Sequence, residues 1–586
     1  MSAFGTSVPL GSIRLLSGAS ASRTRPPAWR TSPTAAHPRR LVPEEDIRTR
    51  RLPVLTALGL AGALALTACG SGGDDDGSDA GADGGGVVTV SNGEPQNPLI
   101  PTMTNEVYGG MVMQNIFAGL VYYDAEGAAV NEVAESIESE DNTTWTITIA
   151  DGWTFSDGTP VTAESFAKAW DYGAALDNKQ SLSYFFEPIQ GFSYDENTSL
   201  IEAGGLTAED DSTLVVTLSQ PESDFPLRLG YAAFFPLPEV FFEDPEAFGE
   251  APVGNGPYML ESWEHDSVVS LVPNPEYTGE RTPQNGGLDL VAYTDEDSAY
   301  NDLLAGELDI IKNVPASAFA TFEDELEDRA VNQPSAVIQT ITVPEWLPEF
   351  QGEAGLLRRQ AVSHAINRPE VTETIFSGSR TPATDFTSPV IDGWTEDIPG
   401  NDVLDYDPEL AAELWAQAEA TSPVGDYTLQ IASNADSDHQ TWVDAVCNNV
   451  RTVLEIGCEF YPYPTFDEFL DARDAGTVPG LFRAGWQADY PAMSNFLGPS
   501  YGTGAGSNDG QWSNADFDAK LAEANGADDP EAAVDLYMEA EAILFEQLPG
   551  IPLWYNNATG GWADTVENVV FGWDSDPILY QVTKSE

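Results

Sequence analysis

Hydrophobic and polar residues alternate with two different periodicities along the chain. At 145–149 apolar residues alternate with threonine, and 214–218 is a second short run of Leu, Val and Thr, so both segments are predicted to be β-strands. Apolar side chains recur at every fourth position from Phe166 to Ala174, downstream of Thr162, a residue type that commonly caps helices. This spacing predicts a helix that begins just after Thr162.

Two further segments carry helix-start signals. Asp407 followed by Pro408 predicts a helix whose apolar face includes Leu410, and Asn514 predicts another whose apolar face includes Phe517. Strands and helices alternate in this way from residue 87 onward, and the sequence has no internal repeat of the kind that builds solenoids or propellers. The pattern therefore predicts an α/β fold with several layers.

The first 69 residues differ from the rest of the chain in charge. They contain nine arginines and three acidic residues, and end in an apolar run at 52–66 followed by Leu66-Thr67-Ala68-Cys69. A basic stretch, an apolar stretch too short for the roughly 20 residues of a membrane span, and small residues together predict a secretion signal. The final tetrapeptide resembles the lipobox of bacterial lipoproteins, which implies that Cys69 is lipidated and becomes the mature N-terminus. An ordinary signal peptide that contains a cysteine is the alternative.

The segment 70–86 contains Gly, Ser, Asp and small apolar residues, and cannot build a core. It is therefore predicted to be a flexible tether between the anchor and a globular body. The chain has two other cysteines, Cys447 and Cys458, and outside the membrane this isolated pair is predicted to form a disulfide. Two reduced, buried thiols are the alternative.

Composition excludes several classes of function. A formal net charge of −71 argues against nucleic acid as a partner, because binding phosphates requires clustered Lys and Arg. The sequence contains no phosphate-binding loop, nucleophile elbow or His-Glu-x-x-His, and no two of its histidines have metal-ligand spacing. We therefore predict no catalytic residue, no metal and no cofactor. A glycosidase with two paired carboxylates is the enzyme alternative that remains formally open.

Several motifs in order along the chain carry a resemblance to a known family. The segment 145–164 (Trp-Thr-Ile-Thr-Ile-Ala-Asp-Gly-Trp-Thr-Phe-Ser-Asp-Gly-Thr-Pro-Val-Thr-Ala-Glu) resembles the signature of the family 5 solute-binding proteins of ABC importers, the oligopeptide- and dipeptide-binding group. Further matching segments are 252–258, 274–277, 306–309, 359–368 and 485–491. The sequence departs from the family pattern at Leu99-Ile100-Pro101 and at Asn367, and both departures look structural.

The resemblance implies a two-lobed, hinged fold of the periplasmic-binding-protein type (type II), with an extra domain on one lobe. The predicted domains are a leader and lipoprotein signal peptide at 1–69, a tether at 70–86, a discontinuous lobe I at 87–117, 226–335 and 559–586, the extra domain at 118–225, and lobe II at 336–558.

The resemblance also implies a ligand site around the segment 483–490. Asp489 would accept the α-ammonium of a bound peptide, which needs a carboxylate partner when it is enclosed. The peptide would lie extended, paired with the main chain at Gly485 and Gln487, as a strand added to the protein. Trp486 would line a pocket for a peptide side chain, and Arg483 would form an ion pair with a peptide carboxylate. Tyr490 and Tyr108 complete the predicted ligand-binding residues.

Each of these assignments has a structural alternative. Asp489 could be a turn residue before Pro491, Arg483 could serve an ordinary ion pair, and Tyr108 could belong to the core.

The sequence therefore predicts the substrate-binding lipoprotein of an ABC importer, anchored on the extracytoplasmic face of the bacterial cell membrane. Its predicted partners are short peptides and the permease and ATPase subunits of the importer, with membrane contact through the lipid anchor only, and it is predicted to be a monomer. The alternatives are a protein of the same fold that binds an oligosaccharide, a nickel chelate or haem, and a lipoprotein sensor that does not transport.

Overall fold

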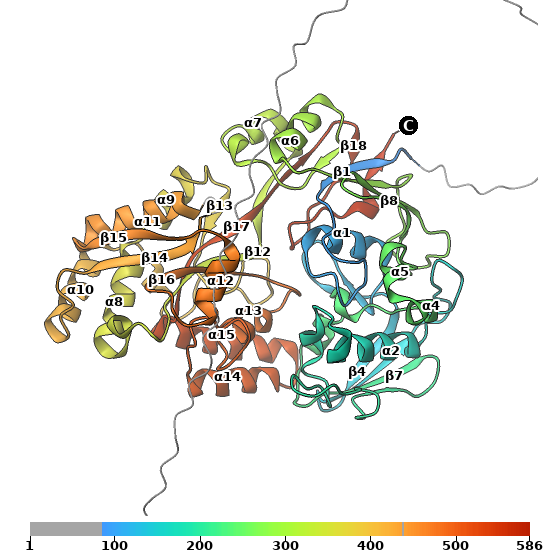
Figure 1. Cartoon of the computed structure of the whole chain (residues 1–586), viewed down its shortest axis with the longest axis horizontal. Coiled ribbons are helices and arrows are strands. Elements are labelled where there is room, and N and C mark those ends of the chain that lie inside the picture. The colour runs from blue at the N-terminus through green and yellow to red at the C-terminus, as the bar shows by residue number, and fades with distance from the viewer. Residues whose placement is uncertain (1–84, 436–438, 586) are drawn as a thin grey trace, which may run out of the picture. The chain divides into compact units, whose positions relative to one another are not determined.

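The computed structural model describes residues 85–435 and 439–585. Residues 80–586 form one compact unit, and the fold below is that of its described part (Figure 1). The predicted signal peptide, Cys69 and nearly all of the predicted tether lie outside the described residues. Within the described residues, no helix has both the length and the apolar character that a membrane crossing requires.

An eleven-stranded mixed sheet forms the centre of the fold. Its strand order is β15 (Gly457–Tyr463), β14 (Thr428–Asn434), β16 (Leu481–Gln487), β12 (Ala330–Thr342), β17 (Gly550–Trp562), β11 (Ile310–Ile311), β1 (Val88–Asn92), β10 (Leu288–Ala292), β9 (Val268–Pro273) and β8 (Tyr258–Glu264), with β13 (Arg380–Pro382) on β17. The two long strands β12 and β17 run antiparallel through the middle and belong to both halves of the sheet. The predicted lobe boundaries at 335/336 and 558/559 fall inside these strands and stay a prediction.

A separate antiparallel sheet lies in the N-terminal third of the described chain. It contains β4 (Ala134–Ser139), β5 (Thr144–Ile149), β7 (Thr213–Thr217) and β6 (Leu206–Ala208). The strands predicted at 145–149 and 214–218 are thus confirmed to within one residue. Helix α2 (Ala163–Ala174) begins after Thr162, as predicted, and contacts β6 and β7. Two short hairpin pairs, β2 (Val121–Tyr123) with β3 (Ala129–Asn131) and β18 (Val566–Glu567) with β19 (Thr583–Lys584), complete the β-structure.

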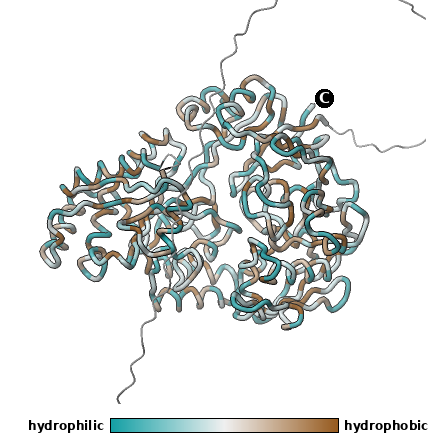
Figure 2. Tube along the Cα trace, viewed as in Figure 1, coloured by the Kyte–Doolittle hydropathy of each residue, from teal (hydrophilic) through white to brown (hydrophobic). Residues whose placement is uncertain are grey.

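The helices cover the sheets and fill the segments between strands. They are α1 (Val107–Ile116), α3 (Phe225–Arg228), α4 (Glu239–Glu243), α5 (Pro245–Glu250), α6 (Glu296–Ala305), α7 (Phe322–Leu326), α8 (Gly352–Ala365), α9 (Arg368–Thr374), α10 (Pro408–Thr421), α11 (His439–Leu454), α12 (Phe466–Asp474), α13 (Met493–Tyr501), α14 (Ala515–Asn525) and α15 (Pro530–Gln547). Figure 2 shows hydrophobic and hydrophilic residues interspersed along these elements, as expected of helices and strands with one buried face.

Helix starts follow the sequence signals closely. Asp407 accepts the backbone N–H of Leu410 at the start of α10, and Asn514 caps α14 in the same manner. The predicted face of α10 is partly wrong, because Leu410 is 37% exposed. The buried face begins one residue later, at Ala411, and runs through Trp415.

The predicted cysteine pair is joined in the structure. Cys447 lies on α11 and Cys458 on β15, with 2.05 Å between the two sulfur atoms. Both residues are buried in the hydrophobic cluster that α11 forms against the sheet. The bond therefore links a helix to the edge strand beside it.

Candidate ligand-binding site

A cavity of about 320 Å³ lies beside the end of β16. Its walls come from several parts of the chain that are far apart in sequence. They include α1 with the residues just before it, β2 with its following turn, Glu132, residues 230–235, Arg281, residues 487–489 and residues 572–580. Of the seven predicted site residues, Gln487 and Asp489 line it.

Asp489 sits in an enclosed, polar corner of this cavity. Asn495 on α13 holds it by two contacts: its Oδ1 accepts the Asp489 backbone N–H at 2.8 Å, and its Nδ2 donates to Asp489 Oδ2 at 3.3 Å. Burial raises the pKa of Asp489 to about 6, against the opposing effects of Asn495, Arg228 and Tyr231. A positively charged partner would therefore stabilise the ionised form of this carboxylate.

Tyrosine rings surround the Asp489 carboxylate. Burial is the largest cause of the raised pKa values of Tyr231 and Tyr184, and the charge of Asp489 is the second. The pKa of Tyr123 is also raised, first by burial, then by Tyr490 and then by the charge of Asp489. Tyr123 and Tyr231 line the cavity themselves. An enclosed carboxylate beside several tyrosines is an environment that favours a cation, because the negative charge attracts it.

One edge of β16 has no strand partner among the described residues between Arg483 and Gln487. β14 pairs with this edge only at the start of the strand, up to Phe482, while β12 pairs with the opposite edge throughout. The Ala488 N–H donates to Ala336 on β12 at 2.9 Å. Because alternate residues direct their peptide groups to opposite edges, the peptide groups of Gly485 and Gln487 face the unpaired edge.

A second cavity of about 160 Å³ lies on the other side of β16, and Gly485 and Trp486 line it. Trp486 Nε1 donates to Asn495 Oδ1 at 3.2 Å, so the amide that holds Asp489 also fixes this ring. Gly485 is required by close packing, since a Cβ there would lie 2.7 Å from the Ile338 carbonyl oxygen.

Arg483 lies outside the lining of both cavities. Burial and the neighbouring charge of Arg473 lower the pKa of the Arg483 guanidinium. Arg473 itself lines the second cavity and pairs with Asp509 at 2.8 Å. Arg483 is thus near the second cavity, where a free carboxylate would relieve the repulsion between two arginines.

Two predicted site residues lie away from the cavity. Tyr490 is 2% exposed and packs in the core beneath Arg228, whose guanidinium carbon is 5.0 Å from the ring centroid. We therefore assign Tyr490 to the core rather than to the ligand site. Tyr108 is on α1 beside the cavity, but its ring faces the backbone at Gly93, where an added Cβ would come within 2.5 Å of it.

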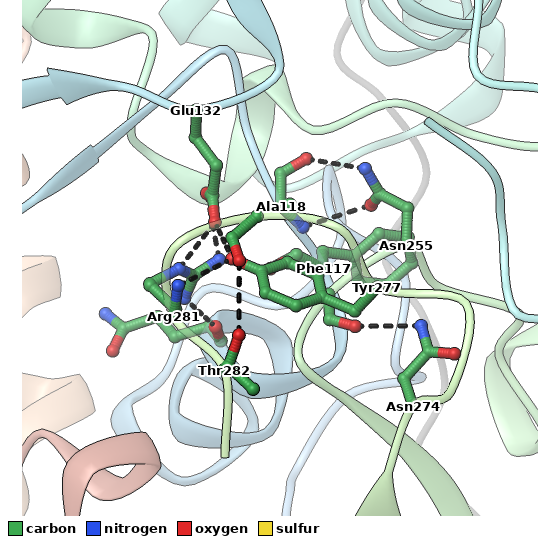
Figure 3. Close-up of polar contacts among 11 residues, drawn as sticks. Phe117, Ala118, Glu132, Asn255, Asn274, Tyr277, Arg281 and Thr282 are labelled. Carbon is green, nitrogen blue, oxygen red and sulfur yellow. Dashed lines mark hydrogen bonds and ion pairs between the residues drawn. The ribbon is translucent and has the colours of Figure 1, made fainter. Parts of the chain in front are cut away.

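The motifs at 252–258 and 274–277 support the cavity wall rather than line it. Asn255 pairs with the backbone of Ala118 through both side-chain amide atoms, at 2.9 and 3.0 Å (Figure 3). Glu132 and Arg281 face each other in the same view, and the guanidinium donates to both carboxylate oxygens, at 2.7 and 2.9 Å. Tyr277 donates to the same carboxylate. This network fixes α1 and β3 on either side of the cavity.

The sequence did not point to three residues of the site. Asn495 and Tyr231 contact Asp489, and Asp574 lines the cavity at another point. Each is a single polar residue far from 483–490 in sequence or outside the quoted motifs, so no pattern marks it. Among the described residues, no group of three or more His, Cys, Asp or Glu side chains is arranged to hold a metal ion.

The fold corresponds to that of known proteins. The structure superposes on that of the Escherichia coli murein tripeptide binding protein MppA with a TM-score of 0.70, at 23% identity and covering 86% of this chain and 99% of that one. The fold is therefore that of the periplasmic binding proteins, as predicted.

Sequence comparison identifies the family. The family model described as bacterial extracellular solute-binding proteins, family 5 Middle, matches residues 128–508. The oligopeptide-binding protein OppA of Bacillus subtilis is 24% identical over 530 residues, covering 86% of this chain and 94% of its own. The probable deoxycholate-binding periplasmic protein YgiS of Escherichia coli is 28% identical over 501 residues, covering 80% and 88%. The chain belongs to family 5 of the bacterial extracellular solute-binding proteins.

Proposed function

We propose that this protein captures short peptides in the cavity beside β16 and delivers them to the permease and ATPase subunits of an ABC importer. The observation that carries the proposal is the enclosed Asp489 carboxylate, which has aromatic and amide neighbours and no ion pair within 4 Å among the described residues. A peptide α-ammonium supplies the missing positive charge.

The unpaired edge of β16 supports a peptide in particular. A peptide that places its α-ammonium at Asp489 runs along Gly485 and Gln487, whose peptide groups face that edge. Main-chain pairing of this kind gives affinity that is independent of side chains, because only backbone groups take part. Broad tolerance of peptide sequence follows, with preferences left to the two cavities.

The charge of the cavity argues against an anionic ligand. YgiS is named as a probable deoxycholate-binding protein, and deoxycholate carries a carboxylate. In the described part of this chain, the cavity lining contains six carboxylates and one basic side chain, Arg281, which is already paired with Glu132. An anion would meet repulsion there, so a cationic group is the better match.

The proposal extends to the cellular setting. We propose that Cys69 carries a lipid anchor, that 70–86 serves as a tether, and that the protein acts as a monomer on the extracytoplasmic face. A diacylated cysteine anchors a protein far more firmly than a single acyl chain.

Calorimetry with a neutral tripeptide and its N-acetylated form tests the proposal on the unaltered protein and on Asp489→Asn. We expect acetylation to weaken binding to the unaltered protein by about 30-fold to several thousand-fold, the effect of removing one partner of an enclosed charge pair. Asp489→Asn should weaken binding of the free peptide similarly, and acetylation should then add little, because both changes delete the same pair.

The matched control is Asp564→Asn, which removes an exposed carboxylate outside the cavity. It should bind both peptides as the unaltered protein does. Equal binding of free and acetylated peptides by the unaltered protein would refute the role of Asp489. Failure to bind any peptide, with binding of a sugar, haem or metal chelate instead, would refute the peptide proposal.

A further inference from the structure

Most of the acidic side chains that line the cavity have partners within the protein. Glu132 is paired with Arg281, as described above. Glu106 caps α1 by accepting the backbone N–H groups of Tyr108 and Gly109, at 2.9 and 3.0 Å. Asp124 accepts the Ala128 N–H at 2.8 Å within a turn. These three carboxylates are accounted for by the fold.

The remaining carboxylates are Asp489 and a pair on the segment 572–580. Asp576 forms an ion pair with the Lys312 ammonium at 2.9 Å. Asp574 accepts the backbone N–H of Asp576 at 3.1 Å, and no Lys or Arg of the described residues forms an ion pair with it. Burial and the adjacent charge of Asp576 raise the pKa of Asp574 to about 7, with Lys312 acting in the opposite direction. Glu106 and Asp124 also lack a basic partner, but each holds backbone N–H groups of a helix start or a turn. Asp489 and Asp574 are the other two lining carboxylates without a counter-ion, and burial raises the pKa of both.

The backbone segments that carry these two carboxylates lie close to each other. Ala336 joins their segments, because its C=O accepts the Ala488 N–H and its N–H donates to the Trp573 C=O, both at 2.9 Å. Two backbones that hydrogen-bond to one residue are at most about 10 Å apart, two strand spacings. The Tyr123 ring packs edge-on against Trp573, with 5.5 Å between the ring centroids, and the charge of Asp489 contributes to its raised pKa, so Tyr123 lies near both segments.

A peptide can satisfy both carboxylates at once. An extended chain advances about 3.4 Å per residue, so a Lys or Arg side chain at the first or second position spans this separation from the α-ammonium. We propose that Asp574 is a second cation subsite of the cavity, and that the protein selects peptides with a Lys or Arg at one of their first two positions. This inference rests on the proposed function and specifies its substrate class.

Matched peptides test the subsite on the unaltered protein. Ala-Lys-Ala and Lys-Ala-Ala are compared by calorimetry with the same peptides carrying norleucine, which has nearly the same shape without the charge. We expect a preference for lysine of roughly 10- to 100-fold at pH 8, the range for a charge pair that is partly screened by solvent. The preference should shrink as the pH falls below 7 and Asp574 is protonated.

Substitution assigns the preference to one residue. Asp574→Asn should reduce the lysine preference, measured as the ratio of the lysine and norleucine affinities of the same variant, to less than threefold. The control Asp564→Asn removes an equal charge from an exposed position ten residues earlier, and should keep the full preference. If Asp574→Asn does not fold, the peptide pairs and the pH dependence on the unaltered protein decide the question without it.

The outcomes separate this inference from the proposed function. Equal affinity for lysine and norleucine peptides, or a preference that Asp574→Asn retains, overturns the second subsite. If both peptides bind equally and Asp489→Asn weakens both, the proposed function stands and this inference alone fails. If neither peptide binds, both fail.

Discussion

Peptide affinity should depend on pH through Asp489, and the size of the effect follows from its environment. Burial raises the pKa of this carboxyl to about 6 in the free protein, while Asn495, Arg228 and Tyr231 favour its charged form. An α-ammonium binds only the ionised carboxylate. At pH 7 about nine-tenths of Asp489 is ionised, and at pH 5 about one-tenth, so the affinity should fall about tenfold between these values, or about 1.4 kcal/mol.

The assay is isothermal calorimetry with a tripeptide of neutral side chains, so that Asp574 plays no part. Between pH 5 and 7 the peptide's α-ammonium and terminal carboxylate both keep their charges, because their pKa values are near 8 and 3.5. Asp489→Asn is the control and should show weaker binding that hardly changes with pH. Unchanged affinity of the unaltered protein across this range, or the same slope in Asp489→Asn, would refute the reasoning.

Three further predictions concern stability and anchoring. Glu541 is fully buried, and burial with the charge of Asp385 raises its pKa, so the free energy of unfolding should fall as the pH rises above about 4.3. In urea titrations, Glu541→Gln should lose less stability than the unaltered protein between pH 5 and 7. Equal losses in the two proteins would contradict this. Replacing Cys447 and Cys458 by alanine should lower the free energy of unfolding by about 3 kcal/mol, the chain-entropy estimate for a loop of this length; under reducing conditions the two forms should converge. Cys69→Ala should abolish partition into detergent, and equal partition of both forms would exclude the lipid anchor.

Local signals in the sequence predicted local structure well. Strand alternation at 145–149 and the capping residues Thr162, Asp407 and Asn514 each mark an element that the structure contains. The error at Leu410 has a simple origin. The prediction placed the larger, more hydrophobic Leu410 on the buried face of α10. Packing against α8 instead puts the buried face one residue later, at Ala411.

The sequence predicted only part of the site, because backbone geometry and topology decide which residues line the cavity. Asp489 and Tyr490 lie in a bend after β16, where Asp489 lines the cavity and Tyr490 is buried in the core. The family motif names the whole segment without distinguishing its two faces. Asn495 lies on helix α13, and Asp574 lies in the segment 572–580, which hydrogen-bonds to β12 through Ala336. No local sequence pattern marks either residue as part of the site.

The scarcity of basic residues in the chain bears on how Asp489 and Asp574 are interpreted. The chain has 24 Lys and Arg against 95 acidic residues, so a surface carboxylate without a partner is ordinary and stays solvated. A buried one is costly, and several buried or half-buried carboxylates are paired with a cation: Glu132 with Arg281, Asp576 with Lys312, and Glu222 with Arg228. Asp489 and Asp574 are among the cavity carboxylates that this distribution leaves without a basic partner. A bound cationic ligand would offset the desolvation that raises the pKa values of both.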